Sequence, residues 1–437
     1  GTWATDVLIA NCPNFTKGTA TSILPSTYGT FSGQTFTTNT SSGMAGVTIT
    51  AATGCTIDAA YVNVDNYGDC LKLVTTAAET NYQITLTAPT GYVITGYSLG
   101  GSANTSDAAH TLTSADGTVS VVASAPLYNS PQGPKDFTVT GLKANSTYFT
   151  INTAKNAKNS SSTAGNTLYI PTFTIYVYPE DQVRDVTYQV YYDGTLKTTA
   201  TATNSIVGST LSLPSSAAKL SCTYTYYSDA SLETEITTVP ATGTVYAKAI
   251  CNCPFTISSS YADATWYYLT LNNTYHPTYA SGSTPNVTLP TSNAYSDENA
   301  MWAFMGNPYD GITIINKAAG SSAKLVSENP PSSDGSSTYA TLASSGTNDV
   351  WFPKSSTSYT NGFYLFISSG YALNKLSYTT GLAFWTGGYD AGSTFTVSEV
   401  DLAAIKSAYL SMYDIADENL DKPGFPKPGL FVPQNML

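Results

Sequence analysis

The chain has 437 residues, which predicts about three domains at roughly 150 residues each. Charged residues make up only 11% of it, its formal net charge is −12 and Arg184 is its single arginine. Such a chain cannot neutralise a phosphate backbone, so nucleic acid is excluded as a partner. No apolar run approaches the ~18 residues that a membrane span needs, so none is expected. Because no charged segment followed by an apolar one opens the chain, we expect a mature exported product or an expressed fragment.

Residues 1–180 predict a jelly-roll-like β-sandwich. Short runs rich in Thr, Val, Ile and Tyr, such as residues 82–87 and 173–178, alternate apolar and polar side chains between Gly, Pro, Asn and Ser. This alternation is typical of strands with one buried face. Residues 179–184 hold a dense group of charges and are expected to form a linker.

Residues 185–250 predict a small β-sandwich or Ig-like module. Several short runs rich in Thr, Tyr and Val fit four or five strands. The first two are separated by Asp193-Gly194, a dipeptide that favours tight hairpin turns.

Residues 251–397 contain a pattern that occurs three times. A tryptophan is followed by a turn with tyrosine, then by glycine and a short strand, starting at Trp302, Trp351 and Trp385. Three hairpins that cannot each bury an apolar face alone can do so together, which predicts a β-trefoil-like module. The tryptophans are expected to pack in its core.

Residues 398–437 predict a short helix and a proline-rich tail. Residues 398–401 resemble a capping box, and the apolar side chains that follow recur at helical spacing. They are Leu402, Ile405, Tyr409, Met412 and Ile415. In the tail, Leu430, Phe431 and Val432 are expected to dock on this chain or on a neighbouring copy.

The six cysteines include no CxxC pair, and only two histidines accompany them, so neither a metal site nor another cofactor is expected. In an oxidising compartment Cys55 could pair with Cys70, closing a loop worth about 3 kcal/mol. Cys222 could likewise pair with Cys251 or Cys253. The alternative is that some of them are buried thiols.

Several segments resemble modules of large secreted Bacteroidetes proteins, which include sialidase-like glycoside hydrolases. Trp302-Ala-Phe-Met-Gly-Asn-Pro-Tyr-Asp-Gly and Leu382-Ala-Phe-Trp-Thr-Gly-Gly resemble their trefoil-like accessory module. Residues 186–194 resemble the small β module that precedes it there, and residues 91–98 resemble the N-terminal sandwich. The resemblance covers about residues 80–400 and implies a secreted, glycan-associated setting.

No catalytic residues are predicted. A sialidase-type site needs a cluster of arginines to hold the substrate carboxylate, and Arg184 alone cannot form one. His110 and His276 lie in polar, loop-like segments without a nucleophile motif. A carboxylate pair for glycoside hydrolysis stays open as a less favoured alternative, because 29 acidic residues offer many combinations.

The turns of the threefold pattern are the predicted binding sites. Aromatic faces pack on the C–H surfaces of sugars, while amides and carboxylates bind the hydroxyl groups. The candidates are Tyr309 with Asp310, Tyr359 with Asn361, and Tyr389 with Asp390. The competing interpretation is that these are ordinary turn residues whose tyrosines cover a hairpin.

We therefore expect a non-catalytic extracellular or cell-surface protein whose modules bind host or dietary glycans. The alternative is a self-assembling adhesin or filament subunit that inserts its C-terminal tail into a neighbouring copy.

Overall fold

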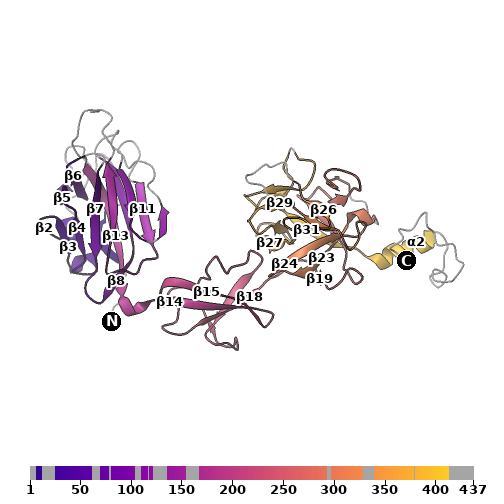
Figure 1. The fold of residues 1–437 in the computed structure, drawn as a ribbon, viewed down its shortest axis with the longest axis horizontal. Helices are drawn as coiled ribbons and strands as arrows, with labels where there is room; N and C mark the ends of the chain where they lie inside the picture. Colours follow the sequence, from indigo (N-terminus) through magenta and orange to yellow (C-terminus); the bar gives the residue numbers. More distant parts are fainter. Residues whose placement is uncertain are drawn as a thin grey trace. The chain divides into compact units, whose positions relative to one another are not determined.

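In the computed structural model, the chain is described over residues 6–11, 25–61, 69–77, 80–103, 110–116, 118–121, 135–153, 167–292, 297–327, 339–377 and 379–412. It divides into two compact units. The first comprises Gly1–Tyr188, Ala200–Ser212 and Ser228–Val245, and the second comprises Gln189–Thr199, Leu213–Tyr227 and Tyr246–Leu437. The fold is predominantly β, as the alternating pattern predicts (Figure 1).

Two antiparallel sheets make up most of the first unit. The first has the order β10-β11-β8-β13-β6-β5, with β1 also paired to β13. Its strands are β1 (Asp6–Asn11), β5 (Cys55–Tyr61), β6 (Asp69–Thr75), β8 (Tyr92–Ala103), β10 (Thr118–Val121), β11 (Lys135–Thr140) and β13 (Thr167–Pro179). The second has the order β2-β3-β4-β7-β12-β9. Its strands are β2 (Gly29–Ser32), β3 (Thr35–Thr38), β4 (Thr48–Ala51), β7 (Asn81–Thr87), β9 (His110–Ser114) and β12 (Ser146–Thr153).

The inward side chains of these two sheets form one hydrophobic core. In β7, Tyr82, Ile84 and Leu86 are buried while the residues between them face outward, because successive side chains of a strand point to opposite faces. Tyr97 and Phe149 lie at its centre with ring centroids 5.7 Å apart. A short helix, α1 (Pro25–Tyr28), and a 3-10 turn, η1 (Thr40–Ser42), lie beside the sheets.

Residues 183–250 form a five-stranded sheet whose residues are divided between the two units. Its order is β15-β14-β18-β16-β17, with β14 (Val183–Tyr192), β15 (Thr195–Ile206), β16 (Thr223–Tyr227), β17 (Glu235–Ile236) and β18 (Val245–Ile250). Asp193 and Gly194 join β14 to β15 with φ of 49° and 73°, as the predicted tight turn requires. The expected linker contains a 3-10 turn, η3 (Glu180–Gln182), between β13 and β14.

An eleven-stranded sheet dominates the second unit, in the order β26-β25-β24-β23-β20-β31-β28-β29-β30, with β19 beside β23 and β27 beside β28. Its strands are β19 (Ile257–Ser258), β20 (Tyr267–Leu271), β23 (Met301–Asn307), β24 (Gly311–Asn316), β25 (Lys324–Val326), β26 (Thr341–Ala343), β27 (Phe352–Ser355), β28 (Phe363–Phe366), β29 (Ala372–Asn374), β30 (Ala383–Trp385) and β31 (Phe395–Glu399). A separate pair consists of β21 (Thr278–Tyr279) and β22 (Val287–Thr288). Two 3-10 turns, η4 (Glu298–Ala300) and η5 (Ala391–Ser393), precede β23 and β31.

Two of the three repeat tryptophans occupy equivalent environments. Trp302 and Trp351 are fully buried, and each donates its indole N–H to a backbone carbonyl about 25 residues earlier. The acceptors are Pro277 at 2.7 Å and Leu325 at 2.9 Å. Trp385 differs because it is only half-buried, while the adjacent Phe384 is in the core.

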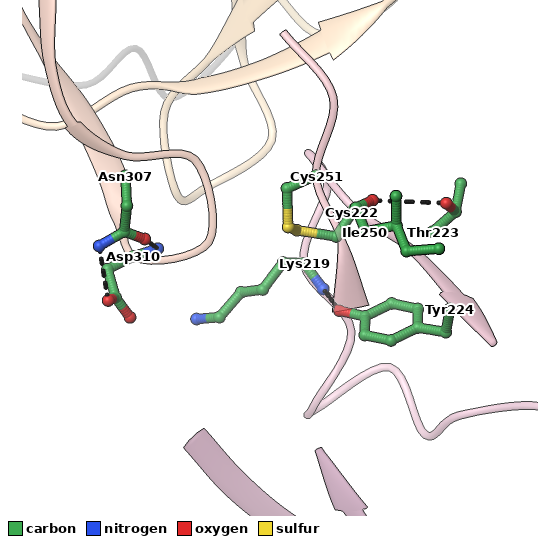
Figure 2. The surroundings of a disulfide bond; sticks show 8 residues. All are labelled: Lys219, Cys222, Thr223, Tyr224, Ile250, Cys251, Asn307 and Asp310. Atoms are coloured by element: carbon green, nitrogen blue, oxygen red, sulfur yellow. Dashed lines mark hydrogen bonds between the residues drawn. A yellow bond between two sulfur atoms is a disulfide. The ribbon is translucent and has the colours of Figure 1, made fainter. Parts of the chain in front are cut away.

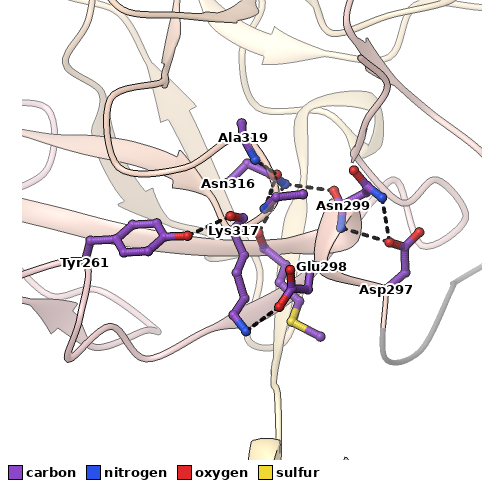
Figure 3. A network of polar contacts seen from close by, with 9 residues as sticks. Tyr261, Asp297, Glu298, Asn299, Asn316, Lys317 and Ala319 are labelled. Atoms are coloured by element: carbon purple, nitrogen blue, oxygen red, sulfur yellow. Dashed lines mark hydrogen bonds and ion pairs between the residues drawn. The ribbon is translucent and has the colours of Figure 1, made fainter. Parts of the chain in front are cut away.

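A buried ion pair lies beside this core (Figure 3). Lys317 Nζ is 2.9 Å from Glu298 Oε1 and 5.9 Å from the ring centroid of Trp266. Tyr261 donates its hydroxyl to the Lys317 carbonyl, and the Asn316 amide donates to the Asn299 carbonyl. The pair is therefore held within a network of polar contacts.

The predicted C-terminal helix is present as α2 (Leu402–Met412). Asp401 caps it, since its Oδ1 accepts from the Ala404 backbone N–H at 2.8 Å. The prediction that Leu402 lies on the buried face is wrong, since this first residue of the helix is 37% exposed, whereas Ile405 packs with Val400 and Leu410 is buried. Ile415 and the predicted docking tail lie outside the described residues.

Of the two alternatives for Cys55, the disulfide with Cys70 is wrong and the buried thiol is correct, since Cys55 is free and buried. The β5–β6 register places Cys55 opposite Thr75 and Cys70 opposite Ala60, so the two cysteines lie five positions apart along the hairpin. Cys222 pairs with Cys251, which resolves the second alternative, and Cys253 is free.

Candidate functional site

The first predicted turn buries its tyrosine. Tyr309 is only 2% exposed and stacks on Tyr192, with ring centroids 5.4 Å apart. The ammonium groups of Lys197 and Lys219 lie 5.7 and 5.5 Å from its ring centroid. Burial, with smaller contributions from Tyr224 and Asp310, raises the pKa of Tyr309 to about 12. The faces of this ring are thus engaged within the second unit.

Asp310 is held by two neighbours. Its Oδ2 accepts from Lys197 Nζ at 2.8 Å and from the Asn307 amide at 2.9 Å, and both bonds lower the pKa of the carboxyl. Figure 2 shows Asn307 and Asp310 across from Lys219, which lies near the Cys222–Cys251 disulfide. Both predicted binding residues of the first turn are therefore engaged in contacts within the protein.

In the second turn, Asn361 has a φ of 56°. This left-handed conformation is one that Asn adopts more readily than most residues. Tyr359 is half-buried, its N–H donates to Ser356 Oγ at 3.0 Å, and its carbonyl accepts from Gly362 at 3.0 Å. Asn361 itself is exposed.

The third turn presents its tyrosine to solvent. Tyr389 is 50% exposed, and its ring packs against Tyr364 and Phe366 with centroids 5.3 and 5.4 Å away. Lys354 Nζ lies 5.2 Å from the ring centroid of Tyr389 and 3.3 Å from its hydroxyl oxygen. We call Tyr389 and Lys354, which the buried Tyr364 and Phe366 support, the Tyr389 surface.

Local sequence explains why this tyrosine is well positioned. Gly388 precedes it with a φ of 59°, and a Cβ there would lie 2.8 Å from Phe366 Cε1, so only glycine fits. Asp390 follows it and caps η5, its Oδ1 accepting from the Ser393 N–H at 2.9 Å and from the buried Asn374 amide at 3.1 Å. Both flanks of Tyr389 are therefore fixed.

The structure brings the second and third turns together. Ser356 Oγ is 3.0 Å from the Tyr364 hydroxyl, which in turn donates to the Tyr389 carbonyl at 3.5 Å. Since Ser356 also accepts from Tyr359, one chain of hydrogen bonds joins these turns. Among the described residues, no hydrogen bond or ring contact joins Tyr309 or Asp310 to either of them.

Sequence reasoning missed Lys354, Tyr364 and Phe366. No short-range alternation marks these residues, because all four residues of β28 are buried; it is the strand register that pairs Lys354 with Tyr364. Their proximity to Tyr389 depends on contacts between residues 35 and 25 positions apart.

The two histidines lie in different modules and make different contacts. His276 is half-buried, and its Nδ1 lies 3.4 Å from both Thr270 Oγ1 and the Leu269 carbonyl. His110 lies in β9, where its backbone pairs with Thr153. Within the described residues, no three His, Cys, Asp or Glu side chains gather as a metal site would require, and no helix is long and apolar enough to cross a membrane.

In comparisons with known proteins, the chain matches no protein-family model and no curated sequence.

Proposed function

We propose that this chain is a non-catalytic, extracellular multi-module protein that binds glycans through the Tyr389 surface. The observation that carries the proposal is a tyrosine that is half exposed yet fixed on both flanks and packed on two further aromatic rings.

Such a ring suits a sugar. Its apolar face can pack on pyranose C–H groups, and its orientation is already set, so little side-chain entropy is lost on binding. Lys354 lies at the edge of the ring and the adjacent Asp390 is exposed, and both side chains can exchange hydrogen bonds with hydroxyl groups. Of the three predicted turns, only this one combines an exposed tyrosine with such neighbours.

The proposal includes the modular architecture expected from the sequence. The shared core of the two N-terminal sheets supports a β-sandwich. The equivalent indole hydrogen bonds of Trp302 and Trp351 support an internal repeat, and with it a β-trefoil-like module. The five-stranded sheet supports the small β module between them.

A glycan array probed with the full chain tests this function, followed by affinity measurements on the best ligand. We expect Tyr389→Ala to weaken binding roughly tenfold, equivalent to about 1.4 kcal/mol. Tyr148→Ala is the matched control, because Tyr148 is also well exposed, at 39%, but lies on β12 in the first unit. Absence of binding to any glycan, or equal affinity for wild type and Tyr389→Ala, would refute the proposal.

A further inference from the structure

We propose that the ligand of the Tyr389 surface is an acidic glycan, and that Lys354 binds its anionic substituent. This inference rests on the proposed function and narrows its substrate class to sugars that carry a carboxylate or a sulfate.

Among the described residues, Lys354 forms no ion pair, in contrast to three other lysines of the second unit. In the second unit, Lys197 pairs with Asp310, Lys317 with Glu298 and Lys324 with Asp349. Within the described residues, Lys354 has no carboxylate partner, and its one hydrogen bond goes to the Tyr389 hydroxyl. An ammonium group has three donors, so two remain for a ligand.

The nearest acidic residue in the turn does not neutralise this ammonium. Asp390 directs Oδ1 toward the Ser393 N–H and the Asn374 amide, and it forms no ion pair with Lys354. Because the Asp390 carboxylate caps the turn, it does not compensate the charge of the Lys354 ammonium. In a chain with a net charge of −12, such a charge is a local exception that favours an anion at this place.

The position of Lys354 is also fixed before a ligand arrives. It belongs to β27, where Pro353 is buried and Lys354 faces the opposite side, half-buried along its stem. Its Nζ reaches the edge of the tyrosine at 3.3 Å from the hydroxyl oxygen. A sugar ring stacked on Tyr389 would therefore bring an acidic substituent within reach of this ammonium.

Lys375 provides a matched control. Its Nζ also lies 5.2 Å from the centroid of a tyrosine ring, that of Tyr275, but it donates to the Leu376 carbonyl at 2.6 Å. Lys375→Gln thus removes the same charge from a comparable cation–π contact with a different tyrosine.

The experiment measures the affinity of the full chain for two pairs of polymers, each with one acidic and one neutral member on the same sugar backbone. Polygalacturonate is compared with its methyl ester, which tests a carboxylate, and dextran sulfate with dextran, which tests a sulfate. We expect at least one acidic polymer to bind about tenfold more tightly than its neutral partner. Lys354→Gln should abolish this preference, whereas Lys375→Gln should retain it, and 0.5 M NaCl should weaken it.

Equal binding of the acidic and neutral polymers, or a preference that survives Lys354→Gln, overturns the inference. Absence of binding to all four polymers overturns the inference as well. If neutral glycans on an array still bind and Tyr389→Ala removes that binding, the proposed function holds and only the preference for acidic glycans is overturned. If no glycan binds at all, both fail.

Discussion

Phe384 lies nearly parallel to the indole of Trp351, with ring centroids 6.3 Å apart and an interplanar angle of 9°. Both side chains are fully buried. Because neighbouring residues of a strand face opposite sides, Phe384 takes the inward position on β30 and Trp385 is directed away from it. The third repeat therefore fills the core with phenylalanine and leaves its tryptophan near the surface.

Phe384→Ala should destabilise the fold by about 3–5 kcal/mol, because it leaves a cavity against Trp351. Trp385→Ala should cost less, since its side chain is already partly exposed. Urea unfolding of the two variants measures the difference. A larger loss for Trp385→Ala would contradict the assignment of the core position.

Lys317→Met should destabilise the protein by about 3–5 kcal/mol, because it removes the ammonium group that pairs with the buried Glu298 carboxylate. The double variant Lys317→Met/Glu298→Leu should recover most of that loss, since neither charge then remains in the core. Lys324→Met is the control, because its partner Asp349 is 39% exposed and such pairs contribute about 0–1 kcal/mol. Chemical denaturation of the four proteins tests this, and equal costs for Lys317→Met and Lys324→Met would contradict it.

Asp310→Asn should lower the melting temperature slightly at pH 7 and by less at pH 2. Lys197 and Asn307 lower the pKa of Asp310 in the folded protein, so the carboxylate stabilises the fold above its unfolded pKa of about 4. That stabilisation is lost as the pH falls through the folded pKa. The effect is small because Asp310 is half exposed and screened by solvent. Thermal scans at both pH values test the sign, and an equal decrease at pH 2 would show that charge is not the cause.

Removal of the Cys222–Cys251 disulfide should cost about 3–4 kcal/mol, from the chain-entropy estimate for a separation of 29 residues. Burial raises the pKa of Cys253 to about 12, which keeps its thiol protonated and unreactive toward the nearby disulfide. Cys253→Ser should therefore leave both the disulfide and the stability intact. Urea unfolding with and without reductant measures the first effect, and mass spectrometry of alkylated cysteines checks the second. Loss of the disulfide in Cys253→Ser would contradict this pairing.

Local features of this chain were predictable from the sequence because their causes lie within a few residues. The alternation in β7 follows from the two faces of a strand, and the Asp193-Gly194 turn follows from the positive φ that these residues tolerate. The start of α2 follows from the capping side chain of Asp401. The candidate tyrosines themselves were also identified in this way.

The sequence by itself determined a predominantly β chain of low charge and named three tyrosine turns, since composition and short-range periodicity suffice for that. Only the tertiary structure decided that Tyr309 is buried against Tyr192 while Tyr389 is exposed beside Lys354. The separation of Cys55 from Cys70 was likewise decided by the tertiary structure, because it depends on the register of β5 and β6. Burial and charge pairing depend on residues that are distant in the chain. The repeat pattern is alike in all three turns, so it cannot predict which distant residues contact each turn.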